Sequence, residues 1–168
     1  MTLNDHIAAI EAAVGDARQG LPEPIFLMLG RLTAAVNVDL LIRDDRGATL
    51  LAWREDHLFR GWHVPGGVVR FKEAMAHRVA EVARLELGAT VSMRPAPLAV
   101  NELIDPARAD RGHFISFLFE CSLTSALDET RQCRGGAPKD GEWAWHATYP
   151  NDMIAFHAIY RGFIGPQR

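Results

Sequence analysis

The segment that decides the fold runs from residue 61 to residue 89 and reads GWHVPGGVVRFKEAMAHRVAEVARLELGA. A short extended stretch, Trp62–Pro65, leads into the glycine pair Gly66-Gly67. After it, Phe71–Leu87 is predicted as one long helix, and Gly88 supplies the stop signal that commonly ends a helix. The residues of this helix carry the chemistry of the segment.

One carboxylate of the predicted helix, Glu86, occupies a position where negative charge is costly. Met75, Val79 and Val82 recur at spacings of four and three, and Glu86 is the next residue on the same face. The last turn of a helix also disfavours an acid. A carboxylate near apolar neighbours needs a compensating cation, either a metal ion or an arginine. The alternative is an exposed or salt-bridged glutamate.

Two other glutamates of the helix need no catalytic explanation. Glu73 is expected near the helix start, where the helix dipole stabilises an acid. Glu81 is expected to pair with Arg78 or Arg84, each three residues away.

Outward from this segment, the sequence predicts a mixed α/β order. Helices are expected at Leu3–Arg18, Pro24–Leu32 and Asn151–Ile164. Strands are expected at Ala35–Arg43, Thr49–Arg54, Val91–Ile104, His113–Cys121 and Glu142–His146. Polar loops are expected at Asp105–Gly112 and Leu123–Gly141. We divide the chain into an N-terminal helical extension, residues 1–33, and a core domain, residues 34–168.

The composition narrows the function classes. A chain of 168 residues with 48% apolar and 23% charged residues is typical of one globular domain. Its formal net charge of −3 gives no electrostatic reason to expect nucleic acid or a membrane surface as a partner. Asp5, His6 and Glu11 stand where a signal peptide needs an apolar core, so we expect a cytoplasmic protein. Cys121 and Cys133 match no zinc pattern and are expected to be reduced thiols.

Polar residues interrupt the two strands before the glycine pair. Asn37 and Asp39 are two residues apart in an apolar strand, so they share one face and need partners there. A ligand site and a structural hydrogen-bond network both satisfy this need. Leu50, Ala52 and Arg54 share a face of the next strand. The forked guanidinium of Arg54 suits a phosphate, and a surface salt bridge is the alternative.

The segment around the glycine pair resembles the Nudix box, Gly-x5-Glu-x7-Arg-Glu-apolar-x-Glu-Glu-x-Gly-apolar. The residues in register are Gly67, Glu73, Ala83, Glu86, Gly88 and Ala89. The box is degenerate, because Glu81 and Val82 stand at the Arg-Glu positions and Leu85 replaces the first paired glutamate. The resemblance implies a Nudix fold, a mixed β-sheet sandwiched between helices, and hydrolysis of a nucleoside diphosphate derivative.

The reduced box is similar to that of the GDP-mannose mannosyl hydrolase branch, which also ends in Glu-Leu-Gly, as residues 86–88 do here. The resemblance implies a homodimer that uses Mg²⁺ to cleave a nucleoside diphosphate-sugar into nucleoside diphosphate and sugar. It implies that Glu86 and a backbone carbonyl at or near Gly66 bind the metal. It also implies that Arg54 steadies the diphosphate, with Asn37 and Asp39 as further substrate-binding candidates.

The branch also has residues that this chain replaces. Its further arginine aligns with Val68, so Arg70, two positions later, is a candidate substitute. Its catalytic histidine aligns with Asp140, which becomes the candidate base. His113 matches a histidine of the branch and is a second candidate, whereas a lone histidine at a strand end can also be structural. His63 and His146 are further candidates for the base.

Three functions of different classes follow. The first is a Mg²⁺-dependent nucleoside diphosphate-sugar hydrolase. The second is a Nudix phosphohydrolase that cleaves a P–O–P bond, which the absence of carboxylates at Val82 and Leu85 disfavours, because attack at phosphorus usually recruits more metal. The third is a nucleotide-sugar binding module without turnover, which the missing histidine base favours.

Overall fold

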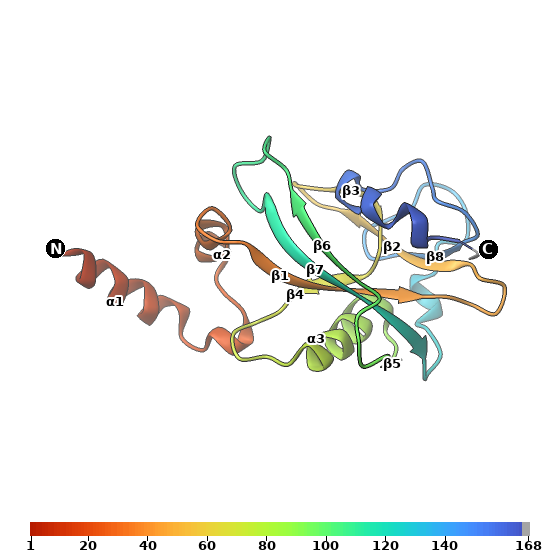
Figure 1. Ribbon diagram of the computed structural model, residues 1–168, viewed down its shortest axis with the longest axis horizontal. Helices are drawn as coiled ribbons and strands as arrows, with labels where there is room; N and C mark the ends of the chain where they lie inside the picture. Colours follow the sequence, from red (N-terminus) through yellow and green to blue (C-terminus); the bar gives the residue numbers. More distant parts are fainter. Residues whose placement is uncertain (166–168) are drawn as a thin grey trace.

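The strands of the protein form two sheets (Figure 1). The computed structural model describes residues 1–165 of the chain. The strands are β1 (Ala35–Ile42), β2 (Thr49–Glu55), β3 (Arg60–His63), β4 (Gly66–Val68), β5 (Val91–Met93), β6 (Ala99–Ile104), β7 (His113–Leu123) and β8 (Trp143–His146). Within the described residues, one sheet has five strands in the order β4-β1-β7-β5, with β6 also paired to β7, and the other has three in the order β3-β2-β8. β1 and β7 run parallel, whereas the other pairs are antiparallel.

The chain also forms helical segments, the first of which extends away from the sheets (Figure 1). They are α1 (Leu3–Val14), α2 (Glu23–Gly30), α3 (Met75–Val82), the π-helical turn η2 (Ala83–Leu87) and the 3-10 segments η1 (Ala17–Gln19), η3 (Glu129–Arg131) and η4 (Ala155–Phe163). The mixed sheet with helices on its faces confirms the predicted α/β class. No helix within residues 1–165 is long and apolar enough to cross a membrane.

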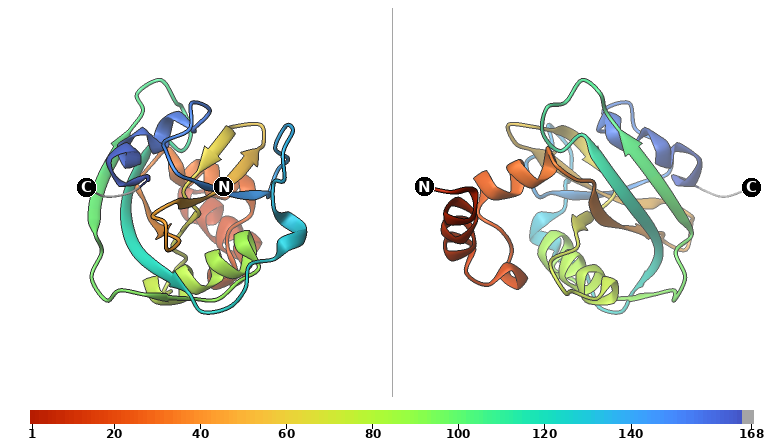
Figure 2. Two further views of the ribbon diagram at one scale, coloured as in Figure 1. Left: turned by 90° about the vertical axis from the view of Figure 1, so that its right-hand side faces the viewer. Right: turned by 60° about the vertical axis from the view of Figure 1, so that its left-hand side comes forward.

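The two faces of β1 separate the core into two clusters. Val38, Leu40 and Ile42 pack in one cluster with Val79 and Val82 of α3 and with residues of β7. Leu41 points the other way and packs in a second cluster with Leu118 and Tyr160. Because side chains alternate along a strand, Asn37 and Asp39 lie on the Leu41 face. α3 and η4 accordingly flank β1 from opposite sides (Figure 2).

The glycine pair lets three elements approach closely. A Cβ on Gly66 would collide with the Asp39 carboxylate, so only glycine fits beside Asp39. A Cβ on Gly67 would lie 3.0 Å from Cγ2 of Val82 and 3.4 Å from Cδ of Arg78. The pair on β4 is therefore held between the Asp39 side chain and α3.

The predicted long helix is shorter and less regular than expected. It starts at Met75 rather than Phe71, because the chain turns at Lys72, whose φ of 56° is left-handed. It ends in the π-helical turn η2, which closes on Gly88 at φ 62°. Such turns within helices are frequent at functional sites.

Other boundaries also differ from the expected ones. The strand expected at Val91–Ile104 is two strands, β5 and β6, because Pro95 and Pro97 interrupt the ladder. The first helix ends at Val14 rather than Arg18, since Gly15 caps it. The C-terminal helix is the 3-10 segment η4. The last residues of the predicted core domain, 166–168, lie outside the described residues, and the proposed division of the chain stays a prediction.

A buried ion pair fixes the entry into α3. Arg78 donates from Nε and Nη2 to the two carboxylate oxygens of Glu73, each at 2.8 Å, and both side chains are less than one-tenth exposed. The Arg70 backbone N–H and the His77 ring also contact this carboxylate. Burial alone would raise the pKa of Glu73, but these hydrogen bonds outweigh it and lower the pKa to about 2. The exposed Glu81 pairs with Arg84, as predicted.

We predict that Glu73→Gln lowers the free energy of unfolding at pH 7 by about 3 kcal/mol, because it leaves Arg78 buried without its anion. Since the folded-state pKa of Glu73 is lowered from 4.5 to about 2, the stabilisation is fully present above the unfolded pKa and is lost as pH falls towards about 2. Urea unfolding across this pH range measures the difference. Glu81→Gln, in an exposed pair, is the control and should cost under about 1 kcal/mol. Equal losses in both variants would contradict the assignment.

Candidate active site

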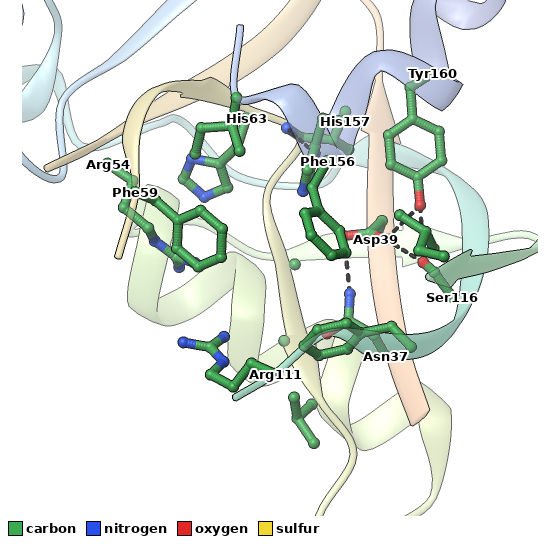
Figure 3. A pocket seen from close by; sticks show the side chains of 17 residues that line it. Asn37, Asp39, Arg54, Phe59, His63, Arg111, Ser116, Phe156, His157 and Tyr160 are labelled. Carbon is green, nitrogen blue, oxygen red and sulfur yellow. Dashed lines mark hydrogen bonds between the residues drawn. The ribbon is translucent and has the colours of Figure 1, made fainter. Parts of the chain in front are cut away.

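The cavity that contains most of the predicted site residues lies on the Leu41 face of β1, next to η4, and has a volume of about 150 Å³ (Figure 3). We refer to it as the main cavity. Its apolar lining includes three phenylalanine rings, those of Phe59, Phe114 and Phe156. Its polar lining consists of Asn37, Asp39, Arg54, His63, Arg111, Ser116, His157 and Tyr160.

Asp39 is the buried carboxylate of this cavity, with only 2% of its surface exposed. It accepts hydrogen bonds from the hydroxyls of Ser116 and Tyr160 and, at 3.0 Å, from Nδ2 of Asn37. Burial raises the pKa of Asp39, although these three donors and His63 oppose the shift. Burial and the adjacent carboxylate raise the pKa of Tyr160. Its hydroxyl therefore stays protonated and donates a hydrogen bond to Asp39. The structure thus shows the hydrogen-bond network for Asn37 and Asp39, and both residues line a cavity; their role in binding a ligand stays a prediction.

Arg54, His63 and Glu86 meet at the junction of two cavities. Arg54 and His63 line the main cavity, and both also line a second one of about 200 Å³ together with Glu86 and Asp140. Nη2 of Arg54 lies 3.5 Å from Oε1 of Glu86, and Nε2 of His63 lies 3.1 Å from its Oε2. A carboxylate only accepts hydrogen bonds, so His63 donates from Nε2. The predicted compensation of Glu86 is therefore provided by an arginine and a histidine.

This junction follows from the strand pattern and the helix end. Leu50, on the same face of β2 as Arg54, packs in the α3 cluster, so this face points towards α3 and η2. The π-helical turn carries Glu86, whose side chain is 20% exposed. The carboxylate therefore faces Arg54 across the sheet edge while part of it stays accessible.

The residues at the junction fit a cation that takes few protein ligands. Among the described residues, no group of three or more His, Cys, Asp and Glu side chains could hold a metal ion. Magnesium, however, keeps several waters and phosphate oxygens and needs only one or two carboxylates. Glu86 supplies one such carboxylate. Gly66 lines the main cavity, where its carbonyl is a candidate second ligand.

The structure brings some of the predicted site residues together and separates others. Asn37, Asp39, Arg54 and Gly66 line the main cavity. Asp140 lines the second cavity beside Glu86, and its Oδ1 accepts the backbone N–H of Glu55 at 2.8 Å.

Two predicted residues lie outside both cavities. Arg70 does not line either cavity, because its guanidinium lies next to Gly20 and its Nη1 donates to the carbonyl of Arg18 at 3.4 Å. His113, at the start of β7, is substantially exposed and its Nε2 lies 3.2 Å from Oε1 of Glu102. The two expectations for Arg70 and His113 are therefore not supported by the geometry.

His157 is a cavity residue that the sequence did not single out. Its Nδ1 accepts the backbone N–H of Val64 at 3.1 Å, so that nitrogen carries no proton. Burial, with the nearby charges of His63 and Arg54, lowers the pKa of His157 well below its usual value. The neutral ring packs edge-on against His63 and Tyr160 and fixes the segment that follows β3.

The aromatic lining was also missed by the sequence analysis. Phe59 comes from the β2–β3 turn, Phe114 from β7 and Phe156 from η4. Phe156 meets Phe59 and Phe114 edge-on at 6.4 and 5.9 Å between ring centroids. No spacing in the sequence connects these three segments. His63 was a minor candidate, and its position just before Pro65-Gly66-Gly67 was the available signal.

Sequence comparison finds a partial relative. No protein-family model matches the chain. The low-salt glycan biosynthesis protein Agl8 of Haloferax volcanii is 35% identical over 92 residues, which cover 52% of this chain and 58% of that protein. The match thus spans less than two thirds of the relative's length.

Solved structures agree on the architecture. The MutT Nudix hydrolase from Burkholderia pseudomallei superposes with a TM-score of 0.57 and 24% identity, covering 76% of this chain and 95% of that one. The MutT protein from Methanosarcina mazei gives a TM-score of 0.57 and 19% identity, with coverages of 77% and 89%. An ADP-ribose pyrophosphatase from Streptococcus suis gives 0.53 and 15%, with coverages of 74% and 82%. The chain therefore has the Nudix fold, as its sequence predicted.

We predict that Tyr160→Phe lowers the free energy of unfolding by about 1–3 kcal/mol, because it removes a hydroxyl that donates to the buried Asp39 carboxylate. The Tyr160 ring and its packing are retained. Chemical unfolding at pH 7 measures the loss, and Tyr149→Phe, which removes the other tyrosine hydroxyl of the chain, is the control. If both variants unfold at the same denaturant concentration as the wild type, the Asp39 network does not stabilise the cavity.

Proposed function

We propose that this chain is a Mg²⁺-dependent Nudix hydrolase that cleaves a nucleoside diphosphate-sugar into nucleoside diphosphate and free sugar. The observation that carries the proposal is the meeting of Arg54, His63 and Glu86 where the two cavities join. An arginine fork and a carboxylate side by side can receive a diphosphate and its cation.

The main cavity supplies room for the uncharged parts of such a ligand. Phe59, Phe114 and Phe156 give apolar surface on which a base or a sugar ring can pack. Asn37 provides an amide close to the Asp39 carboxylate, a polar pair that suits sugar hydroxyls. The low-salt glycan biosynthesis protein matched by half of this chain is in keeping with a sugar-containing substrate.

The carboxylate count favours attack at the sugar carbon. Val82 is buried in the α3 cluster and Leu85 is largely exposed, so Glu86 is the carboxylate that the helix end contributes to the junction. When bound, Mg²⁺ would neutralise the charge of the leaving diphosphate. We assign Asp140, which lines the second cavity together with Glu86, the role of accepting a proton from the attacking water. The new C–O bond forms as the bond from the sugar carbon to the diphosphate oxygen breaks.

A binding module without turnover is the second candidate. The observation in its favour is that both oxygens of Glu86 already have cationic or donor partners, Arg54 and His63. In that case the protein binds the nucleotide sugar and releases it unchanged.

We also propose a homodimer, because α1 has no buried residue and leaves Leu3 and Ile7 exposed. Sedimentation of the purified chain tests this.

We predict that turnover of a nucleotide sugar in ¹⁸O-labelled water places the label in the free sugar. The reason is that the proposed attack occurs at carbon and not at phosphorus. Mass spectrometry of both products reads the result, with unlabelled water as the control. Label in a phosphate product would replace this proposal by P–O–P cleavage, and ligand binding with no products would leave the binding module.

We predict that Glu86→Gln lowers Mg²⁺-dependent turnover by at least about 100-fold while the protein stays folded, since glutamine is nearly isosteric but lacks the charge that a hard cation requires. The thermal stabilisation that Mg²⁺ and nucleoside diphosphate give the wild type should also disappear, because it depends on binding. Glu81→Gln, on the same helix but paired with Arg84, should keep both properties. Loss of the metal effect in Glu81→Gln alone would move the site elsewhere.

A further inference from the structure

The loop Asp105–Gly112, between β6 and β7, brings two arginines to the rim of the main cavity. The guanidinium carbons of Arg108 and Arg111 lie 4.4 and 5.5 Å from the centroid of the Phe59 ring. Arg111 lines the cavity itself, on the same side as Arg54 and Phe59 (Figure 3). From the sequence, this loop was predicted only to be polar.

Among the described residues Arg111 forms no salt bridge, although it interacts electrostatically with the Asp56 carboxylate. Its guanidinium contacts the rings of Phe26, Phe59 and Phe114, at 5.3, 5.5 and 5.9 Å. Its Nε is buried and has no hydrogen-bond partner among the described residues. Burial lowers the pKa of Arg111, the positive charges of Arg54 and Arg108 add to this effect, and the Asp56 carboxylate opposes it. A cation in such surroundings is costly until an anion joins it.

The N-terminal extension holds Arg111 in place. Nη1 of Arg31, just after α2, pairs with Oδ1 of Asp110 at 2.5 Å. A Cβ on Gly30 would lie 3.3 Å from the backbone nitrogen of Arg111, so the last residue of α2 packs directly on the loop. Arg111 has a φ of 53°, a left-handed conformation that costs free energy in a residue with a side chain. Packing against α2 is what maintains it.

We propose that Arg111 is a second phosphate-binding arginine, which together with Arg54 holds the diphosphate of the ligand in the main cavity. This inference rests on the proposed function. Two guanidinium forks on one side of a cavity match the several oxygens of a diphosphate. The surrounding phenylalanine rings keep water away from Arg111 and so strengthen its attraction for an anion. The α2 segment thereby acts as a support of the binding site.

The test measures binding and not turnover. Isothermal titration with inorganic pyrophosphate in the presence of Mg²⁺ is made on the wild type, Arg111→Gln and Arg161→Gln. Arg161 is the matched control, because it also lies over an aromatic ring, that of Tyr149, but is outside the cavity. Arg111→Gln should weaken pyrophosphate binding by at least about tenfold, as expected for a charge-assisted contact. Arg161→Gln should bind as the wild type does.

A second titration distinguishes phosphate binding from base stacking. Guanosine, uridine and adenosine are compared with their diphosphates, using whichever base the wild type binds. The proposal expects Arg111→Gln to lose affinity for the diphosphate and to keep that for the nucleoside. Equal losses for both ligands, or unchanged pyrophosphate binding, would overturn it, as would a wild type that binds no pyrophosphate. Intact diphosphate binding without turnover would instead reject the hydrolase and leave this inference standing.

Discussion

The close packing at Gly66 and Gly67 is the constraint on which the site depends. β4 is only three residues long, and it has the Asp39 carboxylate against one glycine and α3 against the other. Any side chain at Gly66 would displace the carboxylate that Ser116 and Tyr160 hold, and a larger residue at Gly67 would push α3 off the sheet. The distance between the buried polar network and α3 is therefore set by the absence of two Cβ atoms.

Because of this packing, the polar residues near α3 and η2 have different roles: some stabilise the fold, and Glu86 lines the candidate site. The pair Glu73–Arg78 is buried beside the glycines and anchors the helix start. In the box pattern an arginine is expected at the position of Glu81, and Arg78, one turn earlier, takes the place next to Glu73. With the helix anchored there, the π-helical turn at its end is left to present Glu86 to Arg54.

The sequence predicted the elements that rest on local pattern and failed where distant segments meet. The alternation in β1 placed Asn37 and Asp39 on one face, and the helix periodicity identified Glu86 as a residue needing a cation; both were confirmed. Arg70 was misplaced because the left-handed Lys72 turns the chain before α3 begins. Arg111 and the three phenylalanines were missed, because their proximity depends on α2, the β2–β3 turn, the Asp105–Gly112 loop and η4 packing together.

Local charge, and not the charge of the whole chain, explains what the cavity selects. The chain has a formal net charge of −3, yet its main cavity contains two arginines and one carboxylate that three donors neutralise by hydrogen bonding. Arg54 has Glu86 and Asp56 within 4.0 Å, whereas Arg111 has aromatic rings. An extended polyanion needs a broad basic face. Two guanidiniums in one cavity, one of them in contact with phenylalanine rings, instead suit a compact anion joined to an apolar ring, which agrees with the proposed nucleoside diphosphate ligand.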